Sequence, residues 1–453
     1  MITTAFAWSA CVVMFALIAA YGLKRNSIAA LAVSAKLFAL VGVRPVFLLL
    51  GLDTPFPDGR FGNSEYLATL ASAFVAIWLM AFVVGHAAAT AVGPTFLLPM
   101  ASALPNRRTV FRVAFFLSLI GVLITGYFVL DAGSITKFLV SVKTDKDFAG
   151  LYFLRQFSVV GALVAVYGLL SSAQSVADPR QRRLRRLNRR AIYIYGTIIA
   201  SNCLFLYFWG YRNHIMNILL VWGVGYHFYI RRFRLLEIVV LATILFSFLH
   251  SLRYLREYLR LEDPEGEITL AGFSFIRGLS LSLHLQEFDA FMLSLQDAGH
   301  LFNFRGGQDF WNGLISWIPR FVLPDRDTYF IGGWFRQVYE PSRVNGWPIT
   351  PLGSWWVNFG HLGIPLGGLV TGILAGMVDR RYAGGLTSHP WCAAAAAAIA
   401  FFMIDAGFNT GTPQDIFLLI IPLAMAVAFM NASARHSSTR HKAGLVRPTV
   451  PAQ

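Results

Sequence analysis

Arginines stand out in this sequence because their number and placement suit the binding of phosphate groups. Three fall at one end of long apolar stretches, and others, including Arg305, occur in the single long segment without such a stretch. The planar guanidinium group can donate two parallel hydrogen bonds to phosphate. A cavity with several arginines would suit a lipid-linked pyrophosphate, whereas a lone arginine could simply snorkel to the membrane interface. The candidate substrate-binding residues are Arg44, Arg155, Arg212, Arg277, Arg320, Arg336 and Arg343.

Carboxylates in the same long segment could supply a general base, which takes the proton from an attacking hydroxyl group. The candidate catalytic residues are Glu287, Asp289 and Glu340, and His284, His300 and Asp309 lie nearby in the sequence. Glu287 and Asp289 are two residues apart, so a helix would turn them about 200° from each other, and we expect only one to face a cavity. Either could instead pair with an arginine.

We expect neither a metal ion nor a cofactor. The stretch from Asp325 to Asp327 spells a DxD pattern, which binds metal in some enzymes. Its proline-rich context instead predicts a turn, where aspartates hydrogen-bond to the nearby backbone. The three cysteines lie in apolar stretches and form no CxxC pair.

The elements that must position these residues are membrane-spanning helices. Of the 453 residues, 56% are hydrophobic and 13% are charged, and mean hydropathy is +0.58. These values exclude a soluble enzyme, a disordered chain and a coiled coil, since a typical soluble domain carries about 25% charged residues. The apolar blocks are roughly 20 residues long, enough to cross a bilayer. The sequence predicts an all-α polytopic membrane protein with about 11 transmembrane helices, at 5–23, 28–50, 67–92, 109–131, 151–172, 191–209, 212–230, 234–250, 353–378, 390–408 and 413–431.

The predicted spans fall into two groups separated by one large loop. Residues 1–250 hold helices 1–8, residues 251–352 form the loop, residues 353–431 hold helices 9–11, and residues 432–453 form a basic tail. Alternate connections and the tail carry 21 lysines and arginines, against five in the short connections on the other side. Because cytoplasmic loops are enriched in these residues, we expect the N-terminus and the large loop outside and the tail in the cytoplasm.

The net charge of +15 is chiefly this topology signal. No basic domain with interleaved aromatic residues is present, so we expect no nucleic-acid partner. The seven arginines between residues 180 and 190 predict a stop-transfer segment in contact with anionic membrane lipids.

The large loop has the composition of a folded segment. Residues 251–262 have the pattern of a helix lying in the membrane interface, and residues 286–298 repeat apolar side chains at helical spacing. After Gly307 the loop is rich in Trp, Phe, Gly and Pro, unlike a disordered linker. We expect it to fold back over the outer mouth of the bundle. Its tryptophans could stack on sugars, but most suit an interfacial aromatic belt.

Three short motifs in order around this loop resemble those of Wzy-type O-antigen polymerases, which join oligosaccharide repeat units. The segment GYRNHIMNILLVWGVGYHF (210–228) resembles their Gly-x-Arg motif at the start of a span. IPR at 318–320, followed by Pro324 and Arg326, resembles their IPR stretch. PITPLGSWWVNFGHLGIPLGG (348–368) is similar to their NFG-containing start of the span after the large loop. The resemblance covers roughly residues 210–370.

The resemblance implies a metal-independent, inverting glycosyltransferase with a GT-C-like fold in the bacterial inner membrane. Its periplasmic face would take two undecaprenyl-pyrophosphate-linked oligosaccharides, a donor and an acceptor, and a chain-length regulator protein would be a further partner. Arg212 and Arg320 match motif arginines and would contact the donor pyrophosphate, while Asn358 would shape the helix start. Members often have an acidic residue where this chain has Ser354, which leaves the general base open.

Two other functions remain open. An O-antigen ligase would transfer the same donor to lipid A core, but its comparable region often bears a histidine that is absent near Ser354. A flippase or polysaccharide transporter for lipid-linked oligosaccharides would also need an arginine-lined cavity, but not a folded outer loop.

Overall fold

The computed structural model describes residues 2–52, 54–55, 59–92, 107–135, 137–138, 156–177, 185–209, 212–234, 236–238, 240–241, 244, 286–316, 318, 322–323, 331–341, 346–387, 389–404 and 407–445. These parts of the chain are helical and contain no β-strand, only an isolated bridge between Ala298 and Phe302. The prediction of an all-α membrane protein is confirmed at this level.

We call residues 286–359 the outer segment, because the charge bias predicts that this end of the bundle lies outside. The helices before it are α1 Ile2–Arg25, α2 Ile28–Leu37, the π-helix η1 Phe38–Gly42, α3 Arg44–Leu49, α4 Ser64–Val92, α5 Arg107–Asp131, α7 Gln156–Ala177, α8 Arg185–Phe208 and α9 Arg212–Tyr229. Three short helices follow: α12 Gln286–Asp297, α13 Gln308–Ile315 and α14 Ile331–Tyr339. The last part holds α15 Pro351–Phe359, η6 Gly360–Leu362, α16 Gly363–Tyr382, η7 Ala383–Gly385, α17 Pro390–Ala398, the π-helix η8 Ile399–Ile404, α18 Thr412–Asp415, the π-helix η9 Ile416–Ile420 and α19 Ile421–Leu445.

Eight helical stretches in the described residues are long and apolar enough to cross a membrane, and each overlaps a predicted span. Of the other three predicted spans, residues 212–230 form α9, and residues 390–408 form the shorter α17 and η8. Most of residues 234–250 lie outside the described residues. The count of eleven spans therefore stays a prediction. The predicted tail begins inside α19, which continues to Leu445.

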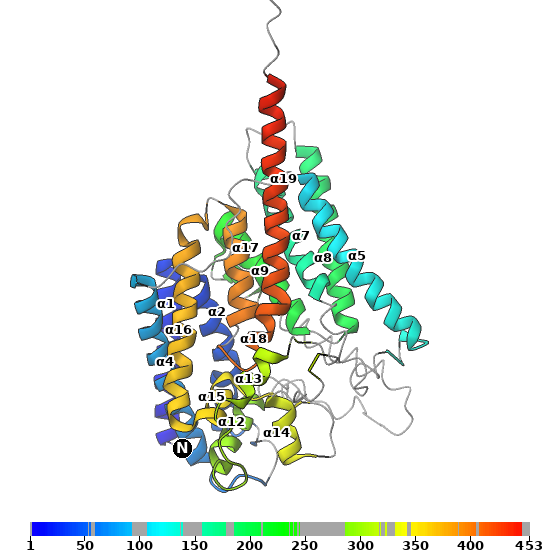
Figure 1. The fold of residues 1–453 in the computed structure, drawn as a ribbon. Coiled ribbons are helices and arrows are strands. Elements are labelled where there is room, and N and C mark those ends of the chain that lie inside the picture. Colours follow the sequence, from blue (N-terminus) through cyan, green and yellow to red (C-terminus); the bar gives the residue numbers. More distant parts are fainter. Residues whose placement is uncertain are drawn as a thin grey trace, which may run out of the picture.

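The long helices lie roughly parallel, with α1, α4 and α16 packed at one side and α5, α7 and α8 at the other (Figure 1). Helices α9 and α17 lie between these groups, and α19 projects beyond the bundle at one end. The short helices α12–α15 gather at the opposite end, near the N-terminus (Figure 1).

A seam of glycines lets α16 approach α4 closely. Gly368, Gly372 and Gly376 recur every four residues, so they share one face of α16. A Cβ atom at Gly368 or Gly372 would overlap a backbone carbonyl of α4, that of Trp78 or Phe82. Small residues at such spacing promote helix association in membranes, where close van der Waals packing replaces the hydrophobic effect.

A buried polar cluster joins three segments at the end of the bundle away from α12–α15. The Asp379 carboxylate of α16 accepts a hydrogen bond from the Ser27 hydroxyl, and its Oδ2 lies 2.8 Å from His86 Nε2 on α4. Asp379 Oδ1 also accepts from the Ala29 amide at 3.2 Å. Charged groups are costly within a membrane unless they are paired. The cluster thus fixes the turn between α1 and α2 against the α4–α16 pair.

The π-helix η8 accepts hydrogen bonds from buried polar side chains of α2 and α9. Lys36 Nζ on α2, just before η1, donates to the carbonyl of Phe401 in η8 at 3.2 Å. Asn217 Nδ2 of α9 donates to the same carbonyl at 2.8 Å. A π-helical turn changes the regular backbone pairing, and such turns recur at functional sites. The buried Lys36 therefore bonds to an irregular helix, as a structural cation.

Candidate functional site

Helix α12 carries two candidate catalytic carboxylates into the bundle's outer end. Its apolar face, with Phe288, Phe291 and Met292 fully buried, packs against α4, α15 and η1, which confirms the helix expected at 286–298. Glu287 and Asp289 stand in its first turn, where the positive end of the helix dipole favours acidic groups. Both are buried, at 7% and 0% exposure.

Arg44 and Asp289 form a fully buried ion pair. Arg44 Nη2 and Nε donate to Asp289 Oδ2 at 2.7 and 3.0 Å, and Nη2 also donates to the Thr54 carbonyl at 2.8 Å. Both side chains have no exposure. The pair joins α12 to the start of α3, although the two residues are 245 positions apart. Asp289 therefore pairs with an arginine, which is one of the alternatives that the sequence left open for this helix.

Arg336 of α14 and Glu340, which directly follows this helix, form a second pair of candidate residues. Arg336 Nη1 is ion-paired with Glu340 Oε2, and the guanidinium lies 4.9 Å from the centre of the Trp347 ring. Arg336 is 4% exposed. The arginine is therefore held between a carboxylate and an indole face, a geometry that favours guanidinium over ammonium.

Tyr339 connects α14 to α12. Its hydroxyl donates to Asp297 Oδ2 at 2.8 Å, and its backbone carbonyl accepts from Arg60 Nη1 at 3.2 Å. Burial and the hydrogen bond to Asp297 raise the pKa of the Tyr339 phenol well above its usual value. The phenol therefore stays a neutral donor at physiological pH, and the outer helices form one cross-linked unit.

A third charged cluster lies where α13 meets the end of α15. Arg305 Nε donates to Asp309 Oδ2 at 2.7 Å, and Asn358 Nδ2 donates to the same oxygen at 3.1 Å. The Arg305 guanidinium lies 4.6 Å from the Trp334 ring centre. Two glycines with positive φ, Gly306 and Gly307, turn the chain sharply into α13.

Asp309 differs from the other outer carboxylates in its second oxygen. Asp309 is 1% exposed, and its Oδ1 has no hydrogen-bond partner within the described part of the chain. A buried carboxylate oxygen without a partner is costly and commonly marks a functional position. Sequence reasoning named Asp309 only as a neighbour, although its spacing of four from Arg305 could have indicated the pair.

Next to this cluster, the chain between η8 and α18 is held by side chains of α15 and α16. Trp355 Nε1 donates to the Phe408 carbonyl at 2.6 Å, and the Phe408 amide donates to Thr371 Oγ1 at 2.9 Å. Gly313 of α13 closely approaches the Thr410 carbonyl, where a Cβ would overlap it. The outer segment therefore packs against the connection between η8 and α18, where the spanning helices are interrupted.

The remaining candidate arginines are not placed by the structure. Arg212 is the first residue of α9, and its side chain is outside the described part. The residues Arg155, Arg277, Arg320 and Arg343 also lie outside the described residues. Among the residues that are described, no group of three or more His, Cys, Asp or Glu side chains could hold a metal ion.

Comparison of the chain with protein-family models, curated proteins and solved structures finds no match.

Proposed function

We propose that this protein is a polysaccharide polymerase of the bacterial inner membrane. It would join undecaprenyl-pyrophosphate-linked repeat units into O-antigen or a related surface polysaccharide, on a GT-C-like fold of about eleven spans with its active face toward the periplasm. The observation that carries the proposal is the folded outer segment, which holds one fully buried and two partly buried arginine–carboxylate pairs against the ends of apolar helices. A flippase needs no such segment. The ordered motifs in residues 210–370 add the substrate class.

The proposed reaction transfers the growing chain to a new lipid-linked unit. A hydroxyl oxygen of the acceptor attacks the anomeric carbon of the donor from the face opposite the pyrophosphate. A glycosidic C–O bond forms with inversion, the bond to the pyrophosphate oxygen breaks, and undecaprenyl pyrophosphate leaves. Arginines stabilise the charge that develops on the leaving group, and a carboxylate takes the hydroxyl proton.

Of the outer carboxylates, Asp309 best meets the needs of a general base. Asp289 is held by Arg44, and Glu340 is held by Arg336. Asp309 is held through Oδ2 only, and its Oδ1 has no hydrogen-bond partner among the described residues. We therefore add Asp309 to Glu287, Asp289 and Glu340 as a candidate catalytic residue.

Single variants test the arginine assignments. Arg212→Ala and Arg320→Ala should abolish long surface polysaccharide on gels at normal protein levels, because both would contact the pyrophosphate. Arg380→Ala is the matched control, since Arg380 is exposed at the other end of α16. Retention of long chains in the first two variants contradicts their assigned role.

Isosteric variants test the base. Asp309→Asn should lower the polymerisation rate about 10²–10⁴-fold, the usual contribution of a general base, in an assay with purified protein and lipid-linked units. Glu287→Gln, Asp289→Asn and Glu340→Gln, assayed in parallel, identify the base if Asp309→Asn stays active.

Deletion of the gene separates the polymerase from the alternatives. Loss of a polymerase leaves product with a single repeat unit, whereas loss of a ligase leaves none. Extension of lipid-linked units by the purified protein would exclude a flippase, and failure of extension with well-folded protein would contradict the proposal.

A further inference from the structure

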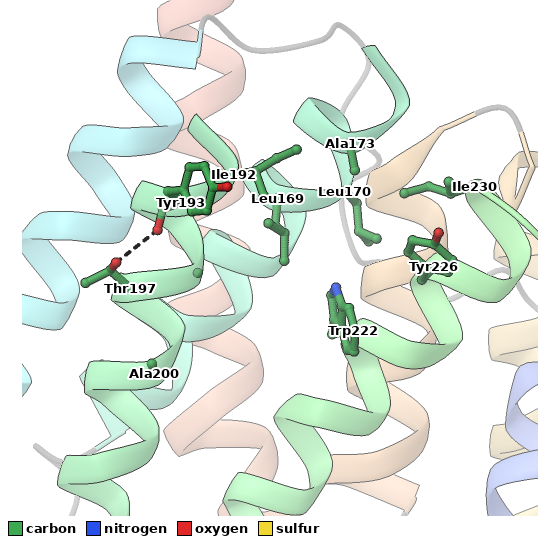
Figure 2. A pocket seen from close by; sticks show the side chains of 11 residues that line it. Leu169, Leu170, Ala173, Ile192, Tyr193, Thr197, Ala200, Trp222, Tyr226 and Ile230 are labelled. Atoms are coloured by element: carbon green, nitrogen blue, oxygen red, sulfur yellow. Dashed lines mark hydrogen bonds between the residues drawn. The ribbon is translucent and has the colours of Figure 1, made fainter. Parts of the chain in front are cut away.

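A groove between α7, α8 and α9 takes no part in the proposed reaction. It has a volume of about 550 Å³ and lies toward the end of the bundle opposite α12–α14. Its walls include Leu170 of α7, Tyr193 and Thr197 of α8, and Trp222 and Tyr226 of α9 (Figure 2).

The lining of the groove suits a hydrocarbon chain. Aliphatic and aromatic side chains form almost all of it. The Thr197 hydroxyl donates to the backbone carbonyl of Tyr193 at 3.0 Å and is thus already satisfied (Figure 2). Tyr193 is 75% exposed, so the groove opens on the side of the bundle, where lipid chains surround a membrane protein. A polar soluble ligand would find few partners here.

One residue that lines the groove is a glycine. Gly196 lines it in the middle of α8, and a Cβ added there would meet no heavy atom within 4 Å. Glycine is less favourable than alanine in a helix interior. Close packing with another helix does not explain this glycine, in contrast to those of the α4–α16 seam. The position leaves part of the groove wall on α8 without a side chain.

Basic residues continue both walls of the groove at one end. Arg189 precedes Tyr193 by four residues, so it lies on the same face of α8 one turn earlier. On the α9 side, Ile230 lines the groove and Arg231 and Arg232 follow it directly. All three arginines are exposed, and Arg231 is ion-paired with Glu237. The two helices thus present an apolar groove whose end is positively charged.

We propose that this groove binds one anionic phospholipid. An acyl chain lies along the apolar walls from Ala200 toward Tyr193, and the phosphate lies against Arg189 and Arg232. A zwitterionic lipid would gain less from the arginines, and a protein partner would leave the narrow apolar groove unfilled. Because the groove is remote from the outer carboxylates, the assignment does not depend on the proposed polymerase activity.

Native mass spectrometry of the purified full-length protein tests this site. After exchange into detergent with phosphatidylglycerol, the protein should retain one lipid, and with phosphatidylethanolamine it should retain markedly less. Gly196→Trp should abolish retention by filling the groove. Arg189→Gln and Arg232→Gln should each weaken binding about fivefold, the effect of roughly one basic residue near an anionic lipid.

Gly126→Trp on α5 is the matched control, since Gly126 also has open space around a Cβ and lies outside the groove. It should retain lipid as the wild type does. Equal retention of both lipids, undiminished binding in Gly196→Trp, or displacement of phosphatidylglycerol by undecaprenyl phosphate would overturn the assignment. Thermal unfolding of each variant separates loss of the lipid from loss of the fold.

Discussion

The pair of Arg44 and Asp289 shows how a charged residue near an apolar span can serve the fold. Removing both charges from water is costly, and their mutual attraction offsets this only with good geometry. Arg44 meets that condition through two nitrogens on the carboxylate and one further bond to the Thr54 carbonyl. The pair therefore attaches the outer segment to the second predicted span.

Breaking this pair from one side should destabilise the protein strongly. Asp289→Asn or Arg44→Met leaves a buried charge uncompensated, and we expect a loss of about 3–5 kcal/mol in the free energy of unfolding. Thermal unfolding of the purified protein in detergent, followed by circular dichroism, measures the loss.

The double variant Arg44→Met, Asp289→Leu separates structure from catalysis. It removes both charges, so most of the stability should return. If polymerisation returns with it, Asp289 serves only the fold. If the double variant is stable and inactive, Arg44 or Asp289 is needed for the reaction. Equal stability of wild type and single variants would show that the pair is not buried in solution.

Among the elements, α4 and α16 pack closely against each other and connect to the outer segment. Gly368, Gly372 and Gly376 bring the two backbones together, and Asp379 follows on the same helix to meet His86. At its other end, α16 continues through η6 from α15, which holds Asn358 beside Asp309. The rigid pair thus connects the inner polar cluster to the outer charged one.

Gly372→Ala should destabilise this pair. The added Cβ overlaps the Phe82 carbonyl, so the helices must separate, at a cost of about 1–3 kcal/mol for overpacking. Gly126→Ala is the matched control, because its Cβ meets open space and alanine favours the helix. Thermal unfolding should show a lower midpoint for Gly372→Ala and an unchanged or higher one for Gly126→Ala. Equal unfolding midpoints would contradict the close packing of α16 against α4 at these glycines.

Hydropathy and periodicity predicted the helices but not their interruptions or contacts. The eight long helices and α12 follow from apolar runs and helical spacing. The π-helices η1 and η8 have the same apolar composition as their neighbours, so no residue type marks them. The pairs Arg44–Asp289 and His86–Asp379 join positions far apart in the chain, and a single sequence gives no signal for such contacts. The local Arg305–Asp309 pair could have been predicted from its spacing of four residues alone.

At the scale of the whole molecule, the structure separates two charged ends. The outer helices α12–α15 gather at one end of the bundle, and exposed basic residues such as Lys24, Arg189 and Arg380 belong to the helix ends away from them. Lysine and arginine near span ends set membrane orientation. The bias of 21 against five thus predicts that α12–α15 face the periplasm. In that orientation, the proposed sugar transfer takes place on the periplasmic side. The proposed phospholipid then lies in the cytoplasmic leaflet.

Cysteine labelling tests this orientation. In spheroplasts, a membrane-impermeant maleimide should label His300→Cys at once, because His300 is exposed in the outer segment. Lys24→Cys, exposed at the opposite end, should be labelled only after lysis. The unmodified chain is the control for labelling of the native cysteines, of which Cys11 and Cys392 are buried and Cys203 is partly buried in α8. The reverse order of labelling would place the outer carboxylates in the cytoplasm, away from a periplasmic lipid-linked acceptor. The proposed polymerase would then fail, whereas the phospholipid groove would persist in the opposite leaflet.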